Sequence, residues 1–86
     1  MWVKYVDPDD ENCVCTVYFR DISCSNAKTP DPRTSVFTGT DTLGEIITIF
    51  KTDDADVCLE ILIDIEDAIQ TGRTLVKFPG ANKYEG

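Results

Sequence analysis

The segment from residue 52 to residue 72 has the strongest pattern of apolar and polar positions in the chain. At about 100° per residue, its apolar positions fall on one broad arc and its acidic positions fall in a narrow band on the other side. The arc contains Val57, Cys58, Ile61, Leu62, Ile65, Ala68 and Ile69. The acidic band contains Asp53, Asp56, Glu60, Asp64 and Asp67, with no basic residue between Asp53 and Gln70. The pattern predicts an amphipathic helix with a core face and an acidic face, ended by Gly72.

A half-buried strand is the alternative for part of this segment. Its alternate positions are apolar and are separated mostly by acidic residues, at Leu59, Ile61, Ile63 and Ile65. Length favours the helix, because the helical period continues through Ala68 and Ile69. The acidic residues of the first turn also suit the positive end of a helix dipole. We therefore predict one long helix over residues 53–70.

Two β-rich runs open the chain. Trp2–Val6 and Cys13–Arg20 are separated by the acidic, turn-forming segment Asp7–Asn12, so they are predicted to pair as an antiparallel hairpin. Alternation along the second run places one set of side chains on the face that we expect to meet the core. This set is Cys13, Cys15, Val17 and Phe19.

The middle of the chain has weaker patterns. Ser23–Arg33 contains two prolines and no periodicity, which predicts a loop. Ser35–Thr38 is predicted to be a short third strand that Gly39 ends.

Asp41–Lys51 fits two interpretations. Thr42 and Glu45 have the spacing of a capping box and the apolar positions follow a helical period, which favours a short helix. The β-branched run 46–49 suits a strand instead. We favour the helix.

These elements predict a single α+β domain over residues 1–86. Its sheet is expected to be mostly antiparallel, with the three N-terminal strands and a C-terminal strand at Arg73–Phe78. The long helix and the shorter helix before it are expected to cover one face of this sheet. The tail Ala81–Gly86 has no structural signal and is expected to fray.

Charge narrows the possible partners. The chain has 16 acidic and 8 basic residues, a formal net charge of −8. Such a surface argues against direct binding to nucleic acid or to an anionic membrane, and favours a basic protein or water. Met1–Glu11 contains no signal-peptide pattern and no apolar run approaches a membrane span, so we expect a cytosolic protein with its four cysteines reduced.

Candidate catalytic chemistry is scarce. The chain has no histidine and no glycine-rich phosphate loop, so we predict no catalytic residue and no cofactor. Four cysteines suggest a zinc site, but Cys13-Val14-Cys15 lacks the two-residue gap of a zinc knuckle. We expect Cys13 and Cys15 to be small core residues without a metal, and Cys24 to be an exposed loop thiol. The acidic segment after Asp7 lacks the glycine and glutamate of a calcium loop.

The candidate partner-binding residues are the acidic band and an acidic turn of Asp9, Asp10 and Glu11. A solvated helix face is the simpler interpretation of the band. In the functional interpretation, the carboxylates of the band are spaced nearly as the phosphates of a nucleic-acid strand are, and they bind in a basic groove of the partner. The sequence thus predicts a non-enzymatic interaction protein that binds a basic partner. The most specific version of this prediction is an inhibitor that mimics nucleic acid and binds a nucleic-acid-binding protein, by analogy with small acidic proteins of phages and mobile elements.

The alternatives are a small enzyme or metal-dependent domain that uses Cys or Asp/Glu side chains, and a structural subunit of an assembly. Self-association also stays open.

Overall fold

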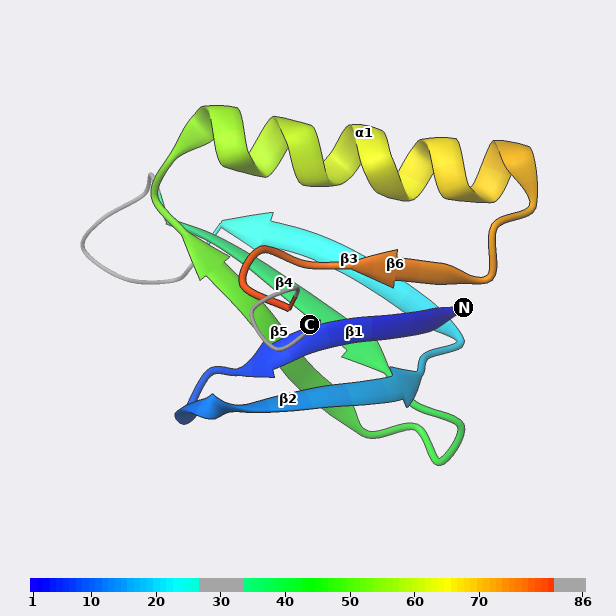
Figure 1. The fold of residues 1–86 in the computed structure, drawn as a ribbon, viewed down its shortest axis with the longest axis horizontal. Coiled ribbons are helices and arrows are strands. Elements are labelled where there is room, and N and C mark those ends of the chain that lie inside the picture. Colours follow the sequence, from blue (N-terminus) through cyan, green and yellow to red (C-terminus); the bar gives the residue numbers. More distant parts are fainter. Residues whose placement is uncertain (27–33, 82–86) are drawn as a thin grey trace.

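A computed structural model of the chain describes residues 1–26 and 34–81. Within these ranges the chain forms two three-stranded sheets and one helix, which confirms the α+β class (Figure 1). The elements are β1 (Trp2–Asp7), β2 (Asp10–Tyr18), β3 (Asp21–Asn26), β4 (Ser35–Thr40), β5 (Ile46–Thr52), α1 (Ala55–Thr71) and β6 (Leu75–Lys77). Among the described residues, no helix is both long and apolar enough to cross a membrane.

The first sheet has the strand order β2-β1-β6. The predicted β1–β2 hairpin is confirmed, and β6 pairs with the other edge of β1 in parallel, with Val3 opposite Val76. In Figure 1, β6 lies between β1 and α1, which runs along one side of the molecule.

The second sheet is the antiparallel series β3-β4-β5. The prediction of a single sheet is wrong, because the chain leaves the first sheet after Tyr18. The Phe19 N–H donates to the carbonyl of Met1 in the first sheet, and the next N–H, that of Arg20, donates to Thr40 in the second.

The predicted loop at Ser23–Arg33 is corrected in its first part, because β3 continues through Asn26; residues 27–33 lie outside the described part of the chain. Ile22 and Cys24 are partly buried against the core, whereas Ser23 and Ser25 face outwards. This polar strand is stabilised by its pairing with β4, which no local pattern indicates. The third predicted strand is confirmed and extends past Gly39 as β4.

The predicted helix over Asp41–Lys51 is also wrong. Both the Leu43 N–H and the Glu45 N–H donate to Asp41 Oδ1 at 2.9 Å, which closes a turn. Gly44 has φ of 86°, a left-handed conformation that interrupts a helix. The β-branched run that follows then forms β5, where its side chains suit a pleated surface.

Helix α1 forms where the acidic and apolar periodicity predicts it. Asp54 caps its first turn by accepting from the N–H groups of Asp56 and Val57, at 2.9 and 3.3 Å. Gly72, with φ of 73°, ends it in a left-handed cap. The final strand is also confirmed, over three of its six predicted residues.

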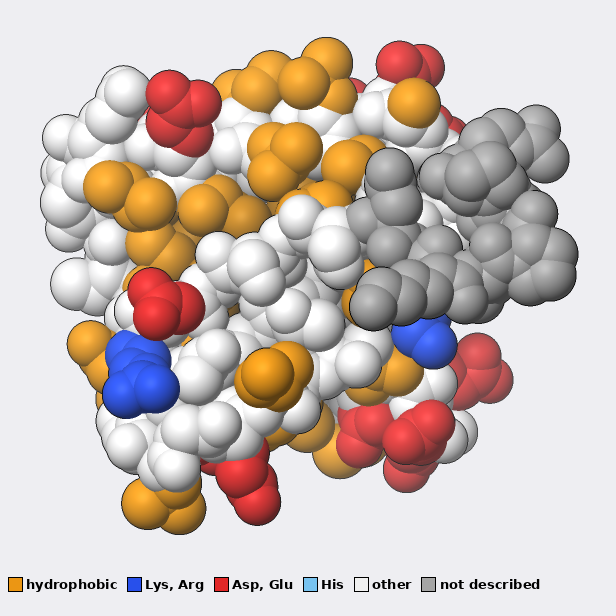
Figure 2. All heavy atoms as spheres, turned by 180° about the vertical axis from the view of Figure 1, so that it is seen from behind, with side chains coloured by type: hydrophobic (Ala, Val, Ile, Leu, Met, Phe, Trp, Pro, Cys, Tyr) orange, Lys and Arg blue, Asp and Glu red, His pale blue; other side chains and the backbone are white. Residues whose placement is uncertain are grey.

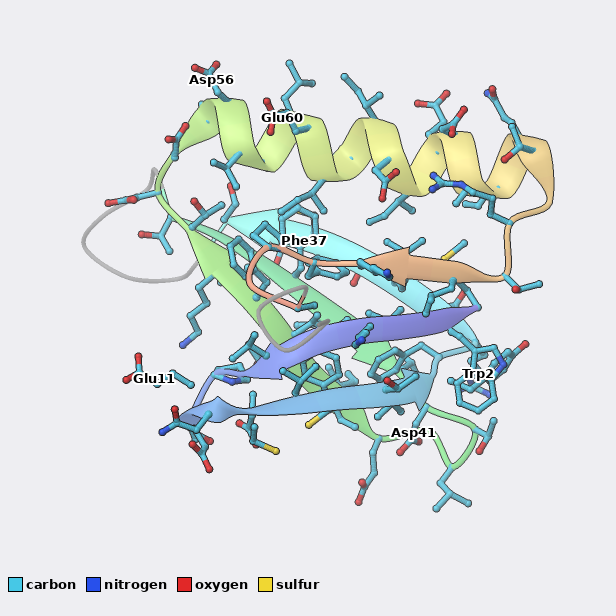
Figure 3. All side chains as sticks on the ribbon, in the orientation of Figure 1. Trp2, Glu11, Phe37, Asp41, Asp56 and Glu60 are labelled. Atoms are coloured by element: carbon cyan, nitrogen blue, oxygen red, sulfur yellow. The ribbon has the colours of Figure 1, made fainter. Side chains whose placement is uncertain are left out.

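The core lies between the two sheets and the inner side of α1. It consists of Val3, Tyr5, Phe19, Phe37, Ile49, Ile61, Ala68, Val76 and Phe78. Figure 3 shows Phe37 in the interior beneath α1, and its ring packs edge-on against that of Phe78 with centroids 5.5 Å apart.

Candidate interaction surface on the helix

The acidic band lies along one flank of α1 and just before it. Asp53, Asp56, Glu60 and Asp67 are exposed and Asp64 is partly exposed. Figure 3 shows Asp56 pointing away from the sheets and Glu60 on the side of α1 that faces the viewer. Among the described residues, no cation lies within salt-bridge distance of Asp53, Asp56 or Glu60. Within residues 1–26 and 34–81, this half of the band presents three carboxylates without a basic partner.

The other half of the band is paired, which the sequence analysis did not predict. Arg73 Nη2 lies 2.7 Å from Asp64 Oδ1 and 3.2 Å from Asp67 Oδ2. The left-handed cap at Gly72 turns the chain back along the helix and brings Arg73 to these carboxylates. The hydrogen bond to Asp64 is the main reason why the pKa of Arg73 is raised. The expectation of an uninterrupted row of free carboxylates is therefore wrong at this end.

The predicted core face of α1 is too broad. Ile61 and Ala68 are buried, and Val57, Cys58 and Ile65 pack partly against the core. Leu62 and Ile69, also predicted to face the core, are 42% and 66% exposed. The contact between α1 and the core is narrow because the sheets lie on one side of the helix only. In the described part of the chain, no second helix covers its other side.

Four large aliphatic side chains therefore form an exposed apolar face of α1. They are Leu59 (56% exposed), Leu62 (42%), Ile63 (57%) and Ile69 (66%). Leu59, Leu62 and Ile63 are neighbours at spacings of three and four residues on the outer side of the helix, next to the acidic band. Ile69 lies two turns beyond Leu62 on the same side, with the exposed Glu66 between them. Figure 2 shows hydrophobic side chains grouped in the upper part of the molecule, where α1 runs, with carboxylates at the margins.

The acidic turn forms a separate surface. Asp9, Asp10 and Glu11 are all exposed at the end of the β1–β2 hairpin. Figure 3 places Glu11 on the opposite side of the molecule from Asp56 and Glu60. Asp10 Oδ1 also accepts a hydrogen bond from the Asn12 N–H at 3.0 Å, so the carboxylate of Asp10 helps to stabilise the turn. The structure does not combine the turn with the band.

The cysteines lie in two pairs. Cys24 is not the exposed loop thiol that the sequence predicts: it is partly buried on β3, with its Sγ 4.0 Å from that of Cys58 on α1. Burial first, and the hydrogen bond to Cys58 second, raises the pKa of Cys24 to about 11. Cys15 packs partly against the core, as predicted, but Cys13 stays outside the core.

Cys24 is expected to be slow to alkylate. At pH 8 a thiol with a pKa of about 11 is ionised in roughly one molecule in a thousand, and the thiolate is the reactive form. We expect iodoacetamide to modify Cys24 at least about ten-fold more slowly in the native protein than in urea, because the higher nucleophilicity of its thiolate offsets part of the lower ionised fraction. Peptide mass spectrometry over time measures this, and equal rates would contradict the placement of Cys24.

Comparison of the chain with protein-family models, with curated proteins and with solved structures returned no match.

Proposed function

We propose that this chain is a non-enzymatic interaction domain that binds a basic protein through the outer side of α1. The observation that carries the proposal is the apolar face of α1 lying next to the carboxylates of Asp53, Asp56 and Glu60, which have no basic partner in the part of the chain that the structure describes. Leu59, Leu62 and Ile63 are exposed neighbours on α1, and such a group of aliphatic side chains on a small domain favours contact with another macromolecule. The adjoining negative charge favours a partner whose apolar contact area has Lys and Arg beside it.

Charge also separates this partner from a second copy of the chain. Two copies that met through α1 would bring two acidic bands close together, and each chain carries a formal charge of −8. Like charges facing each other across an interface oppose association. A basic partner makes two favourable contacts instead. Its apolar part covers the leucines and isoleucines of α1, and its Lys and Arg side chains approach the acidic band.

Mimicry of nucleic acid is the sharper form of this proposal. It relies on Asp53, Asp56 and Glu60, since Arg73 occupies the other carboxylates of the band. Competition decides this point: duplex DNA should displace a mimic from its partner, and should leave a partner bound mainly by the apolar face in place. The cytosol is the compartment that we propose, and the four free thiols support it.

Capture of partners from host lysate by matched variants tests the proposal. Leu59→Ser with Ile63→Ser removes half of the apolar face, and Asp56→Asn with Glu60→Gln removes charge from the band. The apolar control is Leu43→Ser with Ile46→Ser, because these side chains are 87% and 74% exposed at the β4–β5 turn. The charge control is Asp9→Asn with Asp10→Asn in the acidic turn.

We expect wild type and both control variants to recover the same basic protein, and both α1 variants to lose it. Recovery that is unaffected by the α1 variants, or that is lost with a control variant instead, would contradict the proposed surface. Sedimentation of the purified chain is expected to show a monomer. A dimer that dissociates in the Leu59→Ser, Ile63→Ser variant would favour self-association through the same face.

Removal of Arg73 is expected to strengthen partner binding. Arg73→Gln frees the carboxylates of Asp64 and Asp67, so the captured basic partner should associate faster at low salt, with the difference shrinking as salt rises. Surface plasmon resonance over a salt series measures this rate. Arg20→Gln makes the same charge change at an exposed site outside α1 and is expected to have a smaller effect. Equal effects would show that net charge alone, and not the band, steers the partner.

A further inference from the structure

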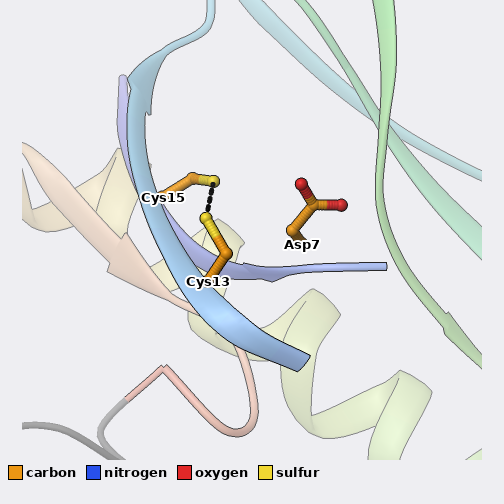
Figure 4. Close-up of side chains that lie close together, drawn as sticks. All are labelled: Asp7, Cys13 and Cys15. Carbon is orange, nitrogen blue, oxygen red and sulfur yellow. Dashed lines mark hydrogen bonds between the residues drawn. The ribbon is translucent and has the colours of Figure 1, made fainter. Parts of the chain in front are cut away.

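A carboxylate and two thiols meet near the turn of the β1–β2 hairpin. The ligand atoms of Asp7, Cys13 and Cys15 all lie within 4.8 Å of one another (Figure 4). The two Sγ atoms are 3.7 Å apart. All three residues are partly buried, so their side chains are held by the protein and still reached by solvent.

The register of the hairpin explains this grouping. Cys13 and Cys15 are two positions apart on β2, so their side chains emerge on the same face. On β1, Val6 is opposite Val14, but the register then shifts and Asp7 is opposite Asp10. Tyr5 is opposite Cys15, so Asp7, two positions further along β1, emerges on the same face as the cysteine pair despite this shift.

We propose that Asp7, Cys13 and Cys15 bind a single thiophilic divalent cation, with Zn²⁺ as the best fit. Thiolate sulfur and carboxylate oxygen are both ordinary ligands of zinc. With Zn–S bonds of about 2.3 Å, two sulfurs of a tetrahedral site are roughly 3.8 Å apart. The observed Sγ–Sγ separation of 3.7 Å matches this edge.

The surroundings favour a cation and leave one position free. The acidic turn of Asp9, Asp10 and Glu11 follows directly after Asp7, in a chain of formal charge −8, so the local field attracts positive ions. Three protein ligands leave the fourth tetrahedral position to water or to a ligand from outside, as in an open zinc site. A cavity of about 310 Å³, lined by Tyr5, Asp7, Thr48 and Lys51 among others, adjoins the carboxylate of Asp7.

The test is titration of the reduced, full-length chain with Zn²⁺ alone by calorimetry, and with Co²⁺ by absorption. We expect one ion per chain and a thiolate-to-cobalt charge-transfer band. Cys13→Ser with Cys15→Ser should abolish both signals. Asp7→Asn should weaken Zn²⁺ binding by about ten-fold or more and keep the charge-transfer band. Its amide oxygen can still accept the 2.9 Å hydrogen bond from the Asp9 N–H, so the turn is retained.

Two control variants give the test its specificity. Cys24→Ser with Cys58→Ser removes the other close thiol pair, whose sulfurs are 4.0 Å apart, and is expected to bind as wild type does. Asp9→Asn with Asp10→Asn is expected to keep the charge-transfer band. The proposal is overturned if wild type binds no ion, if the Cys24, Cys58 variant loses binding, or if the Cys13, Cys15 variant binds as wild type does. Circular dichroism of each metal-free variant confirms that the loss is not unfolding.

Discussion

Ile61→Asp is expected to remove about half or more of the stability of the domain. Ile61 is 7% exposed on the inner side of α1, within the main core. The change removes about 2 kcal/mol of apolar burial and places a carboxylate in the apolar core, for a total of about 4 kcal/mol or more. A domain of this size has a free energy of unfolding on the order of 5 to 10 kcal/mol. Urea denaturation followed by circular dichroism measures the loss.

Leu62→Asp is the matched control, since it makes a similar change one residue further along α1. Leu62 is 42% exposed, so the new carboxylate keeps contact with water, and a cost below about 1 kcal/mol is expected. The sequence pattern alone predicts a severe effect at both positions. Equal losses at Ile61 and Leu62 would show that α1 is rotated relative to the structure described here.

Gly39→Ala is expected to cost more than an ordinary glycine replacement in a strand. A Cβ at this position would lie 2.5 to 2.8 Å from three ring atoms of Phe19, which is fully buried. Overpacking of this kind costs about 1 to 3 kcal/mol, because the ring must shift within a close-packed core. Thermal denaturation should show a lower Tm by several degrees.

A double-mutant cycle isolates the contact between Gly39 and Phe19. Phe19→Leu alone leaves space in the core, and in the Gly39→Ala background the added methyl group occupies part of that space. The double variant is therefore expected to lose less stability than the two single variants together, by about 1 kcal/mol. Strict additivity would show that Gly39 is required for its backbone and not for the space that Phe19 takes.

The elements that the sequence predicts well are the ones with long local patterns. The β1–β2 hairpin and α1 each have an unbroken period and a recognisable end, such as Gly72. The segment at Asp41–Lys51 is harder, because the helical spacing of its apolar residues coincides with a β-branched run. Pairing with β4 then decides the outcome in favour of a strand, and that contact is not local.

The candidate surfaces show the same limit. The acidic band follows from helical periodicity, but its ion pairs with Arg73 depend on how the chain turns after the cap. The exposed apolar face depends on which parts of α1 the sheets leave uncovered. The grouping of Asp7 with Cys13 and Cys15 depends on the pairing of Tyr5 with Cys15, and the sequence predicts the hairpin without fixing this register.

Site-specific photocrosslinking in the host cell is the most direct test of the claim that α1 binds a basic protein. A photoreactive residue replaces Ile63 in one variant and Leu43 in the other, two exposed aliphatic positions of which only the first is on α1. We predict a covalent adduct with a basic protein from position 63 and none from position 43. Adducts from position 43 alone, or from neither position at equal expression, would contradict it.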